Sequence, residues 1–184
     1  EIDELNALLA RIGQPFADAV ELLRETVADG RKIIVIGVGK SDNIGHKVAA
    51  TFNSTGATTV VLNSQNALHG DLGVVGDGDA VIALSYSGET SEVLAILPAL
   101  RRFEVQVIAR TGGAKSTLAR NSDIVLDTSV EREACPLNLA PTSSSTSMLV
   151  LGDALAMVLL ESRGFQQEDF AKLHPGGSLG RALL

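Results

Sequence analysis

The sequence predicts an α/β fold in which helices cover both faces of a five-stranded parallel sheet. Five short apolar segments of strand length are separated mostly by segments with helical periodicity. Aromatic residues make up only 3% of the 184 residues and tryptophan is absent, whereas Ala, Val, Leu, Ile and Gly are abundant. This composition is typical of a parallel sheet buried between helices. The alternation of strands and helices implies right-handed crossovers.

The N-terminal 29 residues predict an amphipathic helix that is broken in two. Apolar residues recur here at spacings of three and four, which places them on one helical face. Gly13 and Pro15 interrupt this pattern. The next segment, residues 31–39, is short, rich in β-branched residues and ends in glycines, so it predicts a buried strand that turns into a helix.

The same alternation continues through the rest of the chain. The patterns predict helices over 43–54 and 90–102, and strands over 58–62, 80–84, 105–109 and 123–127. A long helix over 143–162 follows, and because it is apolar along much of its length we expect it to be largely buried. No linker or repeat divides the chain, so residues 1–184 are expected to form one domain.

Charge and cysteine content exclude several classes of partner. The net charge of −7 and the pI near 4.9, with no run of Lys or Arg, argue against nucleic acid. The single cysteine, Cys135, excludes an intrachain disulfide. We find no signal-peptide segment and no apolar run of membrane-spanning length, so no membrane partner and a cytoplasmic setting are expected. Since the sequence begins with Glu1, we expect a trimmed part of a longer polypeptide.

A serine-rich segment, S-Y-S-G-E-T-S-E over residues 85–92, follows one predicted strand and opens the next helix. Its hydrogen-bond donors are the hydroxyls of Ser85, Ser87, Thr90 and Ser91. Gly88 allows close approach of the backbone, and the helix dipole favours an anion at this position. Ordinary helix capping is the alternative, since S-x-x-E is also a capping box. Four hydroxyls exceed what a cap needs, so we favour a phosphate-binding loop.

The glycine-rich segment G-V-G-K-S, residues 37–41, does not fit the nucleotide-binding motifs it suggests. A Walker A loop would need glycine in place of Ile34, and a dinucleotide-binding loop would need glycine in place of Asp42. What remains is Lys40 at the carboxyl end of the first strand, where its charge can neutralise a phosphate or hydroxylate. An ordinary surface lysine is the alternative.

Two of the three histidines lie in loops that contain glycine or proline. His69 lies in A-L-H-G-D-L-G and His174 in L-H-P-G-G, and both are candidate functional residues. His46 lies in a helical stretch and is interpreted as structural. The sequence contains no close cluster of His, Cys and carboxylates with ligand spacing, so no metal is expected.

An irregular polar loop, residues 131–146, joins the last strand to the long helix. Glu133 is a candidate base, with a solvated surface glutamate as the alternative. Cys135 is interpreted as a buried or half-buried thiol, because no neighbour in the sequence explains how its pKa would be lowered. The hydroxyls of residues 142–146 cap the following helix.

Taken together, these motifs resemble the SIS (sugar isomerase) family, and within it the arabinose-5-phosphate isomerases, from about residue 31 to residue 184. The resemblance rests on an ordered set of segments: G-V-G-K-S, A-A-T-F-N-S-T-G, A-L-H-G-D-L-G, S-Y-S-G-E-T-S-E, V-E-R-E-A-C-P-L-N-L-A-P-T-S-S-S-T, M-L-V-L-G-D-A-L-A and F-A-K-L-H-P-G-G-S-L-G-R. It implies a three-layer αβα sandwich of the flavodoxin-like type.

The resemblance also implies an activity, a site and an assembly. The activity is interconversion of D-ribulose 5-phosphate and D-arabinose 5-phosphate through a cis-enediol, without a cofactor, in the synthesis of the eight-carbon acid of lipopolysaccharide or capsule. The residues matching the family's active site are Lys40, Glu92, Glu133, His174 and His69, and those matching its phosphate-binding segments are Gly39, Ser41, Ser85, Ser87, Gly88, Thr90 and Ser91. Members are typically homotetramers with active sites between subunits, and most carry a pair of CBS domains, which would begin just past Leu184.

We interpret Glu133 as the base that transfers the carbon proton, with a raised pKa suited to that task. His174 would open the sugar ring or move protons between oxygens, and Lys40 with Glu92 would position the substrate. These roles could be exchanged, so either Glu133 or His174 could be the transferring base. Asn66, Asp42 and Asn43 depart from the family's usual residues near the sugar. An isomerase of another sugar phosphate, such as a hexulose phosphate, and a non-catalytic sugar-phosphate sensor therefore remain as alternatives.

Overall fold

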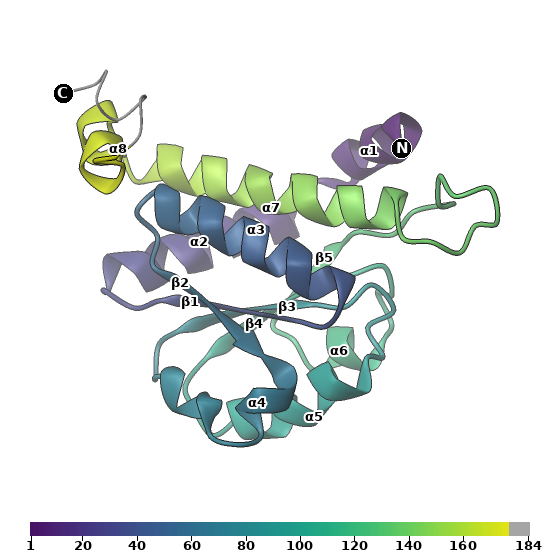
Figure 1. The fold of residues 1–184 in the computed structure, drawn as a ribbon, viewed down its shortest axis with the longest axis horizontal. Helices are drawn as coiled ribbons and strands as arrows, with labels where there is room; N and C mark the ends of the chain where they lie inside the picture. Colours follow the sequence, from purple (N-terminus) through teal and green to yellow (C-terminus); the bar gives the residue numbers. More distant parts are fainter. Residues whose placement is uncertain (177–184) are drawn as a thin grey trace.

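A five-stranded, wholly parallel sheet forms the centre of the molecule (Figure 1). The computed structural model describes residues 1–176. The strands are β1 (Ile33–Gly37), β2 (Thr59–Asn63), β3 (Ala80–Leu84), β4 (Gln106–Thr111) and β5 (Ile124–Asp127), in the spatial order β2-β1-β3-β4-β5. This order is that of the flavodoxin-like folds, in which ligands bind where the strand order reverses, here between β1 and β3.

Helices form a layer on each face of the sheet, which confirms the predicted three-layer α/β fold (Figure 1). One layer contains α2 (Gln14–Ala28), α3 (Lys40–Ser54) and α7 (Ser143–Ser162), and the other contains α4 (Ser64–Ala67), η1 (Asp71–Val74), α5 (Ser91–Leu100) and α6 (Thr117–Arg120). Alternate residues of β1 serve the two layers: Ile33 and Val35 pack in one core, Ile34 and Ile36 in the other. All five β1 residues are buried, as a central parallel strand requires.

The N-terminal helix is broken where the sequence predicted. α1 (Ile2–Arg11) ends before Gly13, and α2 begins at Gln14 with Pro15 in its first turn. α1 lies beside the start of α7, and α8 (Gln167–Leu173) lies at the other end of α7 (Figure 1). The segment after Gly176, which contains the end of the final predicted motif, lies outside the described residues.

The long helix α7 has the predicted bounds but is less buried than expected. Leu151, Leu155 and Leu159 lie in the core, whereas Val150 and Met157 are more than two-fifths exposed. By length and composition α7 could span a membrane, which the sequence analysis did not recognise. Half of its most apolar stretch is buried within the protein, as in the core helix of an α/β layer.

Helix α3 begins three residues earlier than the pattern predicted. Gly39 is its N-cap, with φ +60° and ψ −122°, and Lys40 is its first residue. The turn is tight, because a Cβ on Gly37 would lie 2.9 Å from the backbone nitrogen of Asp42. Glycines at 37 and 39 therefore let the helix start directly at the end of β1, which places Lys40 and Ser41 in its first turn.

Candidate active site

A cleft of about 560 Å³ opens at the carboxyl edge of the sheet. Its lining comes from the first residues of α3 (Lys40, Ser41, Ile44), the loop after β3 (Tyr86, Ser87, Thr90), the segment after β5 (Val130 to Glu133, Asn138, Leu139, Pro141) and the start of α7 (Ser144, Ser145, Met148), together with Val38. The N-termini of three helices, α3, α5 and α7, therefore meet around one cleft. Their dipoles make it favourable for an anion.

Hydroxyl groups within the serine-rich loop form hydrogen bonds that stabilise its conformation. The Oγ of Ser85, a residue only 2% exposed, lies 2.7 Å from Oγ1 of Thr90 and accepts a hydrogen bond from the Gly88 amide at 3.1 Å. Thr90 is the N-cap of α5, yet its side chain makes no capping bond to the helix. Simple capping is thus not what these two hydroxyls do. Ser87 and Thr90 line the cleft, whereas Ser91 donates to Glu92 at 2.8 Å.

Gly88 can only be glycine in this loop. Its φ is +67°, and a Cβ at this position would overlap the side chain of Ser116. The segment after β4 supports the loop through two backbone hydrogen bonds. The Gly112 amide donates to the Tyr86 carbonyl at 2.8 Å, and the Leu118 amide donates to the Gly88 carbonyl at 3.0 Å. Sequence reasoning missed this support, although the T-G-G-A-K-S segment after β4 offered a signal for it.

Lys40 projects from the first turn of α3 at the cleft. Within residues 1–176 its ammonium group has no hydrogen-bond or ion-pair partner, so it is available to an anionic ligand. The neighbouring Asp42 does not neutralise it. Asp42 Oδ2 instead lies 3.6 Å from Nε2 of His46, one helical turn further along α3.

Glu133 lines the same cleft and binds the start of α7. Its Oε2 accepts hydrogen bonds from the amide of Thr142 at 2.8 Å, the hydroxyl of Thr142 at 3.1 Å and the amide of Ser144 at 3.2 Å. The hydroxyl of Ser144 donates to Oε1. Burial favours the neutral acid, but these bonds outweigh it and lower the pKa of Glu133 below its ordinary value. The raised pKa expected for a transferring base is not found.

Cys135 lies just beyond Glu133 in a tight turn that includes Asn138, at φ +54°. Backbone N–H groups of Leu139, Ala140 and Leu137 point at its sulfur and lower the pKa of the thiol. The half-buried position agrees with the sequence interpretation. The donors that act on the thiol were not recognisable in the sequence, because they come from the fold of the turn itself.

Three of the predicted catalytic residues lie outside this cleft. Glu92 is bound to Ser91 on α5, and His69 is exposed in the turn between α4 and η1. His174 ends α8, where its Nδ1 lies 2.8 Å from the carbonyl oxygen of Phe170 and its ring stacks on the Phe170 ring at 3.8 Å. α7 has 20 residues, so its two ends are separated by roughly 30 Å. His174 and Glu133 are therefore not brought together within one chain.

Asn66, at which the sequence departs from the family, is also exposed and does not line the cleft. Conversely, the structure adds Tyr86, Glu131 and Arg132 to the lining. No group of three or more His, Cys, Asp or Glu side chains in the described part of the chain could hold a metal ion.

These features define a parallel α/β protein with an anion-favouring cleft at the carboxyl edge of its sheet. Residues 26–158 match the profile of the SIS domain. The chain belongs to this family.

Comparison with curated relatives agrees with this assignment. The chain is 51% identical over 184 residues to the arabinose 5-phosphate isomerase KdsD of Pseudomonas aeruginosa, and 47% identical to that of Francisella tularensis. In both cases the match covers 100% of this chain and 56% of the relative. The chain thus spans about half the length of these relatives.

Solved structures share the fold. An Escherichia coli protein in complex with arabinose 5-phosphate has a TM-score of 0.83 at 42% identity, with 94% of this chain and 92% of that chain covered. A Bacteroides fragilis protein described as a putative phosphosugar isomerase involved in capsule formation has a TM-score of 0.88 at 32% identity, with 96% and 94% covered.

Proposed function

We propose that the chain is a sugar-phosphate aldose-ketose isomerase that interconverts D-ribulose 5-phosphate and D-arabinose 5-phosphate. The observation that carries this proposal is one cleft, at the carboxyl edge of the sheet, that is lined by the serine-rich loop, Lys40 and Glu133. The names of two curated relatives, at 51% and 47% identity, support the choice of substrate.

The substrate's phosphate fits the loop between β3 and α5. Ser87, Thr90 and the N-terminus of α5 supply donors and a favourable dipole there. The ammonium of Lys40, which has no partner within residues 1–176, stabilises negative charge on the phosphate or on the enediolate oxygen that develops during the reaction. The sugar then extends towards the segment of residues 130–133.

The reaction moves one proton between neighbouring carbons. A base removes the proton from carbon 1 of the ketose to give a cis-enediolate, and the same base returns a proton to carbon 2, while a hydroxyl proton moves between the two oxygens. The substrate's own carbonyl acidifies the carbon proton, so no cofactor takes part in the proposed route.

The lowered pKa of Glu133 affects the assignment of roles. Its hydrogen bonds stabilise the ionised carboxylate, so Glu133 is a weak proton acceptor. The same carboxylate is well suited to stabilise the cleft wall and to accept hydrogen bonds from substrate hydroxyls. We therefore assign proton transfer to His174, and Glu133 to orientation. Since His174 lies at the far end of α7, it would reach this cleft from a neighbouring copy.

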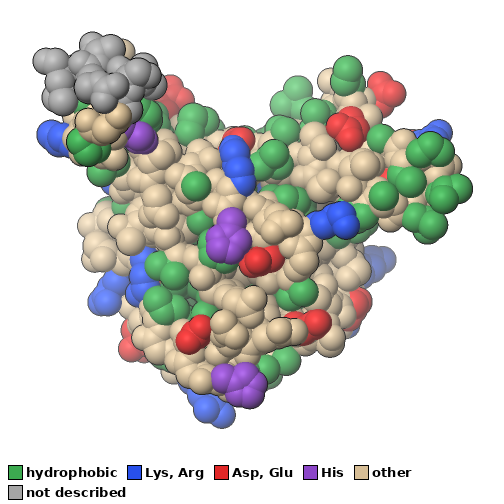
Figure 2. All heavy atoms as spheres, viewed as in Figure 1, with side chains coloured by type: hydrophobic (Ala, Val, Ile, Leu, Met, Phe, Trp, Pro, Cys, Tyr) green, Lys and Arg blue, Asp and Glu red, His purple; other side chains and the backbone are tan. Residues whose placement is uncertain are grey.

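A homotetramer with active sites between subunits would bring His174 of one copy to the cleft of another. Leu137 and Leu139, at the edge of the cleft, are 75% and 76% exposed, and Val150, Met157 and Val158 are exposed on α7. Hydrophobic side chains gather on the projecting loop before α7 (Figure 2). Sedimentation velocity tests this proposal: Leu137→Ser with Leu139→Ser should shift the assembly towards smaller species, and a monomeric parent protein would contradict it.

We further propose a cytoplasmic site of action, in a pathway that supplies the eight-carbon acid of lipopolysaccharide or capsule. The single cysteine and the phosphorylated substrate support this location.

The test is to incubate the chain with D-ribulose 5-phosphate in deuterated buffer and to follow the sugars by proton NMR. D-Arabinose 5-phosphate should appear with deuterium at carbon 2, and Lys40→Met should slow its formation at least tenfold. A chain that binds the ketose but gives no exchange and no product would overturn the proposal in favour of a sensor.

A further inference from the structure

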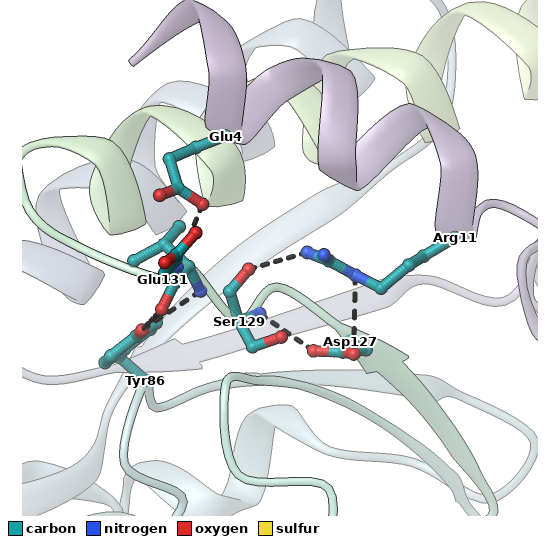
Figure 3. Close-up of polar contacts among 7 residues, drawn as sticks. Glu4, Arg11, Tyr86, Asp127, Ser129 and Glu131 are labelled. Carbon is teal, nitrogen blue, oxygen red and sulfur yellow. Dashed lines mark hydrogen bonds and ion pairs between the residues drawn. The ribbon is translucent and has the colours of Figure 1, made fainter.

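The wall of the cleft formed by residues 130–133 is held from outside by helix α1. Glu4, a carboxylate only 8% exposed, accepts hydrogen bonds from the backbone amides of Glu131 at 2.9 Å and Arg132 at 3.1 Å. Figure 3 shows Glu4 projecting from α1 onto this segment. The two partners lie 127 and 128 positions away in the sequence, so only the tertiary fold creates this contact.

A second side chain of α1 binds the chain just before this segment. Arg11 Nη2 donates to the carbonyl of Ser129 at 2.6 Å, and its Nε lies 3.4 Å from Oδ2 of Asp127 (Figure 3). These contacts lie before the lining residues and do not touch the amides that Glu4 holds. Glu4 and Arg11 thus attach the same helix at two separable places.

The opposite side of the segment is held by the serine-rich loop. The hydroxyl of Tyr86 accepts a hydrogen bond from the Val130 amide at 3.2 Å and donates to the Val130 carbonyl at 3.5 Å. The wall is therefore clamped between the loop after β3 and α1. Arg132 and Glu133, at its end, line the cleft together with Val130 and Glu131.

We propose that Glu4 is a positioning residue for the isomerase reaction: its carboxylate sets the backbone of residues 131 and 132, and through it the placement of Arg132 and Glu133 against the sugar. This inference rests on the function proposed above. A buried carboxylate that accepts hydrogen bonds from two successive backbone amides fixes both the distance and the direction of these amides. A purely apolar contact with α1 would not fix their direction.

Three variants separate positioning from general stability. Glu4→Gln keeps the shape of the side chain but removes the charge and one of the two amide acceptors. Asp3→Asn removes the same charge from an exposed neighbour on α1. Arg11→Gln weakens the attachment of α1 without touching the amides of residues 131 and 132.

The experiment measures kcat and KM for D-ribulose 5-phosphate in the four proteins, together with their thermal unfolding midpoints. We expect Glu4→Gln to raise KM and to lower kcat/KM by about tenfold or more. Asp3→Asn should behave as the parent, and Arg11→Gln should lower the midpoint with KM unchanged. Destabilisation alone reduces the amount of active protein, which lowers the apparent kcat and leaves KM as it was.

The outcomes distinguish the two proposals. An active parent chain whose Glu4→Gln variant keeps the parent KM would overturn the positioning role and leave the proposed function intact. A parent chain that neither binds nor converts the sugar phosphate would overturn the proposed function, and the role of Glu4 would fall with it.

Discussion

Glu133 and Thr142 lie nine positions apart, yet the Glu133 carboxylate accepts hydrogen bonds from both the amide and the hydroxyl of Thr142. Thr142 is the N-cap of α7 and makes no capping bond with its own side chain. The carboxylate therefore caps a helix from outside it, and one side chain joins the cleft to the long core helix.

Replacing Glu133 should cost stability in a way that depends on pH. Since the folded pKa is lowered, the carboxylate stabilises the fold above its unfolded pKa, and this contribution is lost as the pH falls through the folded pKa. We expect Glu133→Gln to be less stable by about 1 kcal/mol at pH 7, a typical cap contribution. Urea unfolding from pH 7 down to about pH 3 should bring the variant and the parent together. A difference that does not change with pH would contradict the assignment.

Gly88→Ala should damage the phosphate loop more than its backbone angle alone explains. The matched control is Gly164→Ala, because Gly164 has φ +65° with no atom near the added Cβ, whereas Gly88 has φ +67° and faces Ser116. Both variants carry the positive-φ strain of about 1–3 kcal/mol, and only Gly88→Ala adds the overlap. Urea unfolding and calorimetry with inorganic phosphate measure the two effects. Equal losses in both variants would show that the contact with Ser116 does not matter.

Arg110 is a fully buried cation at the end of β4, and none of its side-chain nitrogens has a hydrogen-bond partner among the described residues. Burial lowers its pKa to about 10, with Asp153 opposing the shift. The unfolded chain binds the guanidinium proton of Arg110 more tightly than the folded chain does. The buried charge therefore destabilises the fold by about 3 kcal/mol at neutral pH, and this penalty decreases as the pH rises through 10.

Arg110→Met should therefore raise the free energy of unfolding at pH 7 by roughly 1–4 kcal/mol. Arg102→Met, at an exposed position on the same chain, is the control and should change it little. Urea unfolding measures both. A destabilised Arg110→Met protein would mean that the guanidinium has a favourable interaction that outweighs its burial.

Cys135 should react faster with iodoacetamide near pH 7 than an ordinary thiol does. The amides that point at its sulfur stabilise the thiolate, so the reactive form is present at lower pH. The rate as a function of pH, in buffer and in 6 M urea, measures this effect. The pH at which the reaction rate is half its maximum should be higher in the unfolded protein. Identical values in buffer and in urea would exclude an effect of the turn.

The sequence by itself predicted most of the secondary structure and the place of the serine-rich loop between β3 and α5. The strand over 80–84 and the helix over 143–162 have the predicted bounds, and the helix break at Gly13 and Pro15 is confirmed. These features follow from periodicity and turn residues, which act over a few positions along the chain. The positions of Lys40 and Ser87 at one sheet edge also followed, because parallel strands present their carboxyl ends together.

Only the tertiary structure decided which side chains act on one another. Glu4 binds the amides of residues 131 and 132, and Glu133 becomes a helix cap with a lowered pKa. Arg110 is buried with no hydrogen-bond partner for its side chain among residues 1–176. His174 is stacked on Phe170 at the far end of α7 from the cleft. A local pattern sets what each segment becomes, but the solvation and hydrogen bonding of a side chain depend on residues that are distant in the sequence.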